Sequence, residues 1–208
     1  MLQTKNISFN YPNGPGFSFP DLHVKAEEVL LVLGRSGSGK TTLLHLLAGL
    51  MEPDSGSVHI DGTSIIELKG SGRDAFRGRN IGMVFQQAQF IRSINLMQNL
   101  QLARSLAGLP NDEALALSLL TELGIEDKAT NRPSELSIGE RQRAGIARAL
   151  VTRPKVVLAD EPTSALDDVN CELVTALLQK TVTGHGAALI IVTHDQRLKT
   201  RFSNSVSL

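Results

Sequence analysis

A glycine-rich run near the start of the chain carries the residue types that bind phosphate groups. It reads GRSGSGKT over 34–41 and fills the pattern G-x-x-x-x-G-K-[ST] completely. Glycines let backbone N–H groups converge on phosphate oxygens, Lys40 can reach the β- and γ-phosphates, and the Thr41 hydroxyl can bind Mg²⁺. A strand-like VLLVL (29–33) precedes the run and a helix-like TTLLHLLAGL (41–50) follows it, which a chance glycine-rich turn would not require. The sequence therefore predicts a nucleoside triphosphate site with Mg²⁺.

Two acidic residues and a histidine stand at the ends of later apolar segments. Asp160 and Glu161 close the segment KVVLAD (155–160), and His194 closes ALIIVTH (188–194). Ligands of open α/β sheets bind outside the carboxyl ends of the strands, so these side chains would face the glycine-rich loop if the strands are parallel neighbours. Asp160 would then hold Mg²⁺, and Glu161 would orient or deprotonate an attacking water. The alternatives are a helix cap or a solvated charge for each acid, and a structural group for the histidine.

Strand and helix patterns alternate around these residues. Buried strands are expected at VLLVL, IGMVFQ (81–86), KVVLAD and ALIIVTH, and helices at 41–50, 138–151 and 167–180. This alternation favours an α/β fold with a mainly parallel sheet covered on both faces. Short β-like runs with turn residues in the first 25 positions predict an antiparallel β subdomain at the N-terminus.

A helical pattern interrupts the alternation in the middle of the chain, after a turn-rich stretch at 52–62. We therefore expect a single domain over 1–208. Its α/β core, with the antiparallel edge, would occupy 1–86 and 136–208. A helical subdomain would be inserted at 87–135.

The composition limits the classes of protein to which the chain can belong. Its 208 residues, 41% of them hydrophobic, can bury the core of one domain, and 21 basic side chains balance 21 acidic ones. This balance provides no field to attract nucleic acid, so no nucleic-acid partner is expected. Cys171 is the only cysteine, the first residues lack the apolar core of a secretory signal, and no apolar run approaches the ~20 residues that cross a bilayer. We expect a cytoplasmic chain that reaches a membrane only through a partner.

Five further motifs accompany the glycine-rich loop. They are VFQQ (84–87), LSIGERQ (136–142), LADEP (158–162), SALD (164–167) and THD (193–195). With these motifs in this order over nearly the whole chain, the sequence resembles the ATP-binding subunits of ABC transporters. The resemblance implies a P-loop NTPase core and an ATPase that works as a homodimer, with two ATP molecules held head to tail between the subunits.

The resemblance also assigns catalytic and metal-binding roles. Gln86 would join Thr41 and Asp160 at the Mg²⁺ and water site and would sense the transmembrane partner. His194 would contact the γ-phosphate beside Glu161. Without the family, Gln86 would be read as a polar residue at a strand end.

Other assignments concern the nucleotide and the dimer contact. Tyr11 resembles the aromatic residue that stacks on adenine, although it is a lone tyrosine beside a Pro-Asn-Gly turn. Ser164 and Asp167 resemble the loop that carries information across the dimer interface. The residues expected to contact nucleotide are Tyr11, Gly34, Arg35, Ser36, Gly37, Ser38, Gly39, Lys40, Thr41 and Thr42.

The stretch LSIGE resembles the family's signature sequence, which closes over the γ-phosphate bound to the other subunit. Ser137 and Glu140 have the spacing of a capping box, so a helix is expected to start there and to offer a second set of anion-binding N–H groups. Ile138 and Glu140 depart from the usual LSGGQ, whereas Ser137 and Gly139 do not. We expect Ile138 to be tolerated, and the charge of Glu140 to be offset if its carboxylate caps Ser137.

These observations predict a motor subunit that hydrolyses ATP and drives a separate permease at the inner face of the cell membrane. The short cassette most resembles the subunits for lipoprotein release and macrolide export. One alternative is a soluble ABC protein acting on DNA or ribosomes, which the neutral charge and the single cassette disfavour. Another is a regulatory cassette of low turnover, which Glu161 and His194 disfavour and Glu140 leaves open. No residue identifies the cargo or its direction of travel.

Overall fold

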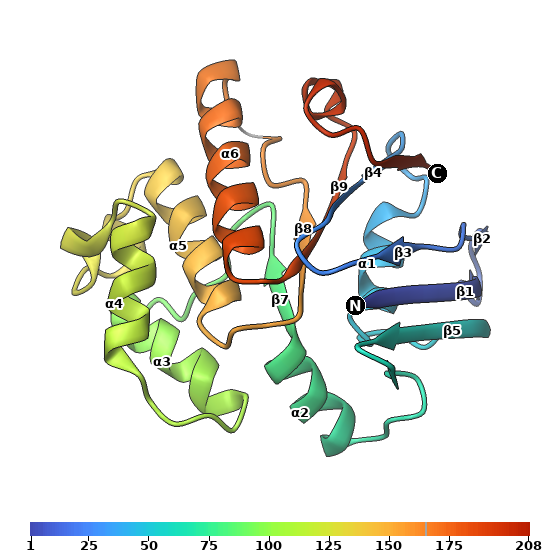
Figure 1. Ribbon diagram of the computed structural model, residues 1–208, viewed down its shortest axis with the longest axis horizontal. Coiled ribbons are helices and arrows are strands. Elements are labelled where there is room, and N and C mark those ends of the chain that lie inside the picture. Colours follow the sequence, from blue (N-terminus) through green and yellow to red (C-terminus); the bar gives the residue numbers. More distant parts are fainter. Residues whose placement is uncertain (165) are drawn as a thin grey trace.

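The computed structural model describes residues 1–164 and 166–208, and its strands form two separate sheets (Figure 1). The strands are β1 (Leu2–Asn10), β2 (Gly16–Ser18), β3 (His23–Val24), β4 (Val29–Leu33), β5 (Ser55–Ile60), β6 (Thr63–Ser64), β7 (Ile81–Val84), β8 (Val156–Asp160), β9 (Ala188–Thr193) and β10 (Ser205–Ser207). The α-helices are α1 (Lys40–Leu47), α2 (Ser71–Asn80), α3 (Leu96–Leu106), α4 (Glu113–Glu122), α5 (Ile138–Leu150) and α6 (Asp168–Gly184). Three short 3₁₀ helices are η1 (Glu126–Lys128), η2 (Pro133–Glu135) and η3 (Gln196–Thr200).

The central sheet is parallel and has the strand order β10-β4-β9-β8-β7. Strand β9 lies between β4 and β8, with Thr193 opposite Leu33 and Val192 opposite Asp160. The three strands that precede the predicted chemical residues are thus parallel neighbours, and their carboxyl ends meet at one edge. The expected α/β class with a mainly parallel sheet is confirmed.

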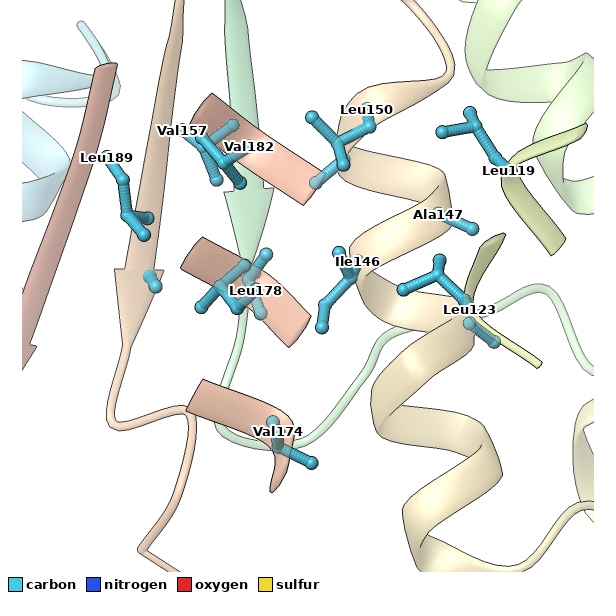
Figure 2. Close-up of a cluster of buried hydrophobic side chains, with 14 of the residues drawn as sticks. Leu119, Leu123, Ile146, Ala147, Leu150, Val157, Val174, Leu178, Val182 and Leu189 are labelled. Carbon is cyan, nitrogen blue, oxygen red and sulfur yellow. The ribbon is translucent and has the colours of Figure 1, made fainter. Parts of the chain in front are cut away.

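The central sheet buries apolar side chains on both faces. Alternate residues of β4 divide between two cores, with Leu31 on the helical face and Leu30 on the other, as period-two side-chain alternation requires. Helices α3 to α6 cover the first face, while α1 and the antiparallel sheet cover the second (Figure 1). Figure 2 shows Ile146 and Leu150 of α5 and Leu178 and Val182 of α6 between these helices and the strands, with Leu119 of α4 on the other side of α5. Burying each such side chain contributes about 1.5–3 kcal/mol, which fixes the strand ends that carry the site.

Local signals set the starts of several helices. Helix α3 begins with a capping box between Asn95 and Gln98, and helix α4 is capped by Asp112, whose carboxylate accepts the N–H of Leu115 at 2.9 Å. Gly124, at φ 64°, follows α4 with the left-handed backbone that commonly ends a helix. The expected helical pattern in the middle of the chain is confirmed. In the described part of the chain, no helix combines the length and the apolar character needed to span a bilayer.

Three segments differ from the sequence predictions. The stretch 52–62, expected to be turns, contains β5, because Val58 and Ile60 alternate with polar residues and are buried against β1. Strands β1, β2, β3, β5 and β6 form a separate antiparallel sheet, so the expected antiparallel β subdomain is confirmed. Helix α2 was not predicted, because it buries none of its residues and contains two glycines, so it has no apolar stripe to reveal it. Strand β7 ends at Val84, which leaves Gln86 in the following loop.

Candidate functional site

The glycine-rich loop joins β4 to α1 and curls around a buried lysine. Gly37 and Gly39 have φ values of 81° and 92°, which favour glycine, and they let the backbone turn tightly before the helix. Lys40 Nζ donates to the carbonyl oxygens of Gly34 and Arg35 at 2.9 and 3.0 Å, and only 7% of Lys40 is exposed. The loop therefore holds its ammonium group at its own centre.

Two features of the loop fit a bound phosphate group. Helix α1 has no side-chain cap, so the N–H groups of its first turn are available to an anion. Ser38 Oγ is buried and has no hydrogen-bond partner within the described residues. A triphosphate oxygen is the kind of acceptor that these donors lack, so the residues present fit ATP.

A hydroxyl and a carboxylate meet beside the loop. Thr41 Oγ1 donates to Asp160 Oδ2 at 3.4 Å, across 119 positions of sequence. Burial, and secondarily the charge of Glu161, raises the pKa of Asp160, and a cation here would stabilise its ionised form. No group of three or more histidine, cysteine or acidic side chains in the described residues could hold a metal by itself. Thr41 Oγ1 and Asp160 Oδ2 offer two protein oxygens, and Mg²⁺ typically takes one or two of these together with substrate phosphates.

Glu161 and His194 form a close pair at the ends of β8 and β9. The Glu161 carboxylate can only accept, so His194 Nδ1 donates to Oε1, at 2.8 Å. Thr193 Oγ1 donates to Glu161 Oε2 at 2.7 Å, and Lys40 Nζ lies 3.7 Å from Oε1. Glu161 has φ 46°, a left-handed conformation unusual for a glutamate, and its N–H donates to the Val192 carbonyl at 2.9 Å. The strand ends thus place a carboxylate, an imidazole and the loop ammonium within direct reach of one another.

Gln86 lies beside the predicted interface loop. Its Nε2 donates to Ser164 Oγ at 2.9 Å, and Ser164 Oγ donates to the Glu161 carbonyl at 3.1 Å. In the described residues, no hydrogen bond joins Gln86 to Thr41 or Asp160. Two residues predicted from separate motifs are therefore brought together, and the metal role of Gln86 stays a prediction.

Asp167 caps helix α6 at the other end of that loop, of which residue 165 lies outside the described residues. Its carboxylate accepts the N–H of Asn170 at 2.9 Å and the Asn170 side-chain amide at 2.7 Å. These two bonds lower the pKa of Asp167. The carboxylate is exposed and its position is fixed by the helix start.

Tyr11 lies against the start of α1. Its hydroxyl is 3.1 Å from Thr42 Oγ1, and its ring packs edge-on against Phe9, with 4.8 Å between ring centroids. The ring of Phe17 covers Gly39 so closely that a Cβ there would lie 2.6 Å from it. Tyr11 is 39% exposed, so one face remains open beside the loop. Phe17 was missed by the sequence analysis because nothing in a three-residue strand marks it.

The signature stretch starts α5 with the predicted capping box. Glu140 Oε2 accepts the N–H of Ser137 at 2.7 Å, and Ser137 Oγ accepts the N–H of Glu140 at 3.3 Å. The Ser137 bonds are the main cause of a lowered pKa for Glu140, and the charge of Lys128 contributes. Ile138 is 64% exposed and keeps an ordinary negative φ. The predicted capping by Glu140 is confirmed.

The capping box leaves two donors of the first turn free. In the part of the chain that the structure describes, the N–H groups of Ile138 and Gly139 have no hydrogen-bond acceptor. No hydrogen bond or ion pair of the described residues joins this stretch to the glycine-rich loop either. The chain therefore has two separate places where backbone N–H groups can bind an anion: the glycine-rich loop with the start of α1, and the start of α5.

Several residues that support the site carry no sequence signal of their own. Thr163 and Cys171 both donate to the Asp195 carboxylate, at 3.2 and 3.7 Å, and Arg197 holds that carboxylate with two nitrogens. Hydrogen bonding to Arg197 is the main cause that lowers the pKa of Asp195 to about 2. Gln142 donates to the Pro162 carbonyl at 3.1 Å and ties α5 to the segment after Glu161. Asp195 fell within the motif THD and Gln142 within LSIGERQ, whereas Thr163, Cys171 and Arg197 fell within none of the recognised motifs.

This parallel sheet with its loop and strand-end carboxylates defines the class of P-loop nucleotide-binding proteins. The sequence profile described as "ABC transporter" matches residues 19–164. The chain belongs to this ABC transporter family. It is an ATP-binding subunit that hydrolyses ATP and serves as the motor of a transporter.

Individual relatives agree with this assignment. The "Lipoprotein-releasing system ATP-binding protein LolD" of Syntrophotalea carbinolica is 41% identical over 95% of this chain and 90% of the relative. The "Methionine import ATP-binding protein MetN" of Brucella abortus is 40% identical over 99% of this chain and 56% of the relative. Among solved structures, a dimer of the ATP-binding cassette MJ0796 in a post-hydrolysis state with ADP and Pi has a TM-score of 0.87, at 31% identity, and covers 100% of this chain and 94% of that one. The predicted family, fold class and ATPase activity are confirmed.

Proposed function

We propose that two copies of this chain close around two molecules of Mg-ATP. The glycine-rich loop of one copy and the signature stretch of the other would hold each nucleotide. The observation that carries this is the pair of separate anion-binding groups on one chain, the loop around Lys40 and the free N–H groups of Ile138 and Gly139. One triphosphate meets both groups only if a second copy supplies one of them.

Within that arrangement each side chain has a defined task. Lys40 and the backbone of the loop bind the triphosphate, and Tyr11 packs on the adenine. Glu161 accepts a proton from the attacking water and orients it. His194 donates Nδ1–H to Glu161, and its Nε2 can donate to the γ-phosphate when the ring carries both protons. Ser137 uses its oxygen to accept the Glu140 N–H, so its hydroxyl proton is available to the partner's nucleotide.

Mg²⁺, when bound, supplies positive charge against the triphosphate. The residues that would hold it are Thr41 and Asp160, with Gln86 reaching the same site when it leaves Ser164. Gln86 donates to Ser164 of the predicted interface loop, so a displacement of that loop at the dimer contact would also change the position of the Gln86 side chain.

The permease would dock in a groove of about 700 Å³ between α2, β7, α3 and α5. Leu50, Ile91 and Leu106 line it and are 49%, 52% and 77% exposed. Phe85 also lines the groove and is the neighbour of Gln86, so an occupant would press on the loop that carries Gln86. The Arg148 guanidinium packs over the rings of Phe85 and Phe90, 5.7 and 5.4 Å from their centroids, and stiffens this wall. Docking here would place the chain on the inner face of the cell membrane.

Glu161→Gln tests the dimer. Loss of the base should stop hydrolysis while ATP binding persists, so the variant should elute as a dimer from a size-exclusion column run in Mg-ATP and as a monomer in Mg-ADP. The double variant Lys40→Ala, Glu161→Gln is the control and should stay monomeric in both. A monomer of Glu161→Gln at saturating Mg-ATP would contradict the proposed ATP-held dimer.

Ile91→Glu tests the docking groove. The charge should reduce the fraction of the chain that sediments with membranes of cells expressing the complete transporter, while ATP binding by the purified chain stays unchanged. Leu117→Glu is the matched control, because Leu117 is 45% exposed on α4 and does not line the groove. If both variants sediment with membranes to the same extent, the groove is not the docking surface.

A further inference from the structure

One guanidinium group connects two parts of the site that have so far been described separately. Arg197 lies in η3, three positions after His194. Its Nε and Nη2 donate to the Asp195 carboxylate at 2.9 and 2.7 Å. Its Nη1 donates to Asp168 Oδ1 at 2.6 Å and to the Leu166 carbonyl at 3.3 Å. A single side chain thus contacts two segments that are about thirty positions apart in sequence.

On one side, Arg197 donates hydrogen bonds to residues at the end of the predicted interface loop. Leu166 and Asp168 are the two neighbours of Asp167, the exposed residue that caps α6. Because the guanidinium holds both neighbours, a displacement of Asp167 pulls directly on Arg197.

On the other side, hydrogen bonds lead from Arg197 to the catalytic carboxylate. The N–H of Asp195 donates to Thr193 Oγ1 at 3.0 Å, and that hydroxyl donates to Glu161 Oε2 at 2.7 Å. Thr193 is fully buried, so water does not compete for these bonds. The path from the loop to Glu161 therefore consists of direct contacts throughout.

The chemistry of the link requires an arginine. A planar guanidinium donates in several fixed directions at once, whereas a lysine ammonium acts as a point charge and cannot bind Asp195 with two nitrogens while it also reaches the loop. The Asp195 side chain is 9% exposed, and its pKa of about 2 keeps it ionised at any working pH. The link is thus permanently charged and partly buried.

We propose that Arg197 is a positioning residue that couples the interface loop to the Glu161–His194 pair. Docking of a second copy against Asp167 would set the orientation of Glu161 through Arg197, Asp195 and Thr193, so that hydrolysis is fast only in the closed dimer. This inference rests on the proposed function, because it takes the loop as the dimer contact.

The first experiment compares steady-state ATP hydrolysis by the wild type, Arg197→Ala and Arg197→Lys. We expect both variants to lose about tenfold in kcat, within the range of coupling effects, with KM changed by less than about twofold. Lysine should not rescue the rate, because charge without the fork geometry is insufficient. Arg201→Ala is the matched control: Arg201 follows η3, contacts Gln179 at 3.3 Å, and should keep the wild-type rate.

A second variant avoids any disturbance of Asp195. Asp168→Asn weakens only the contact on the loop side, and the Asp168 side chain is 90% exposed, so the fold should be retained. We expect a smaller fall in kcat, and a double variant with Arg197→Ala that is no slower than Arg197→Ala alone. Additive losses, a wild-type rate for Asp168→Asn, an unchanged kcat for Arg197→Ala, or full rescue by lysine would each overturn the coupling. Failure of the proposed dimer would appear separately, as a monomeric Glu161→Gln chain with Arg197 intact.

Discussion

The glycine-rich loop and the signature stretch both present backbone N–H groups to an anion, but they are built in opposite ways. The loop gathers groups from distant parts of the chain, with Lys40, Asp160 and Glu161 half-buried or buried around it. The signature stretch is one exposed helix start whose side chains mainly satisfy each other. The glycine-rich loop is part of a site whose charged side chains already lie around it. The signature stretch is an exposed surface that meets a ligand only when another molecule docks against it. In the proposed arrangement, this difference means that one chain binds the nucleotide and a second chain encloses it.

The largest effect should come from removing the charge at the centre of the loop. Lys40→Ala should weaken ATP binding at least about 100-fold, because a buried ammonium that pairs with phosphate has no replacement in the loop. Isothermal titration with Mg-ATP measures this directly. Lys69→Ala, at an exposed lysine, should bind as the wild type does. Wild-type affinity for Lys40→Ala would refute the assignment of the loop.

The Asp195–Arg197 pair, which lies just after the strand end that carries His194, should make the fold sensitive to acid. The folded-state pKa of Asp195 is about 2, below the ordinary 3.8, so its ionisation stabilises the fold above pH 4 and that contribution is lost as the pH falls from about 4 to 2. The shift corresponds to about 2 kcal/mol. Urea unfolding between pH 5 and 2 should show a steeper loss for the wild type than for Asp195→Asn. If the stability of both proteins fell equally with pH, the ionised Asp195 would not be stabilised by its contacts with Arg197 in the folded state.

Substitutions in the signature stretch should have smaller effects, and they should change stability and the rate of hydrolysis instead of ATP binding. Ser137→Ala should cost about 1 kcal/mol of stability, the usual value of a helix cap, and should leave ATP binding by the single chain unchanged. Its hydrolysis should fall, because the hydroxyl offered to the partner's nucleotide is lost. Thermal unfolding and nucleotide titration separate these effects. Weakened ATP binding by the monomeric variant would mean that Ser137 contacts the nucleotide held by the glycine-rich loop of its own chain, and the proposed difference between the two stretches would be wrong.

The smallest effect is expected at Glu140. A glutamine keeps the oxygen that caps Ser137 and removes the negative charge, so Glu140→Gln should unfold at nearly the wild-type temperature. Turnover should stay equal or rise, because repulsion of the partner's γ-phosphate is relieved. Measurement of kcat at saturating ATP decides this. A collapse in turnover would mean that the charge itself takes part in closing the site.

The sequence could predict the parts of the site that depend on strand ends. Parallel strands bring their carboxyl ends to one edge, so the convergence of Lys40, Asp160, Glu161 and His194 followed from three apolar runs. The capping of Ser137 by Glu140 followed from a spacing of three residues.

Other contacts had no comparable rule. Arg197 reaches Asp168 only because η3 turns the chain back over α6, and Phe17 covers Gly39 only because two sheets pack across α1. Strand β5 was hidden by the turn residues Pro, Asp, Ser and Gly at its start, and its alternating Val58 and Ile60 were too few to outweigh them. Long-range packing decides such contacts, and a single sequence does not encode it in any local pattern.

The left-handed backbone of Glu161, at φ 46°, has a consequence for how this protein would change under selection. Glycine adopts that conformation without strain, whereas an ordinary side chain pays about 1–2 kcal/mol. Glycine at position 161 would relieve this strain, but it would also remove the carboxylate that His194, Thr193 and Lys40 contact, and it would leave the buried Thr193 hydroxyl without its acceptor. These two effects on stability oppose each other, so selection for heat resistance alone has no strong reason to replace the carboxylate that we propose as the base.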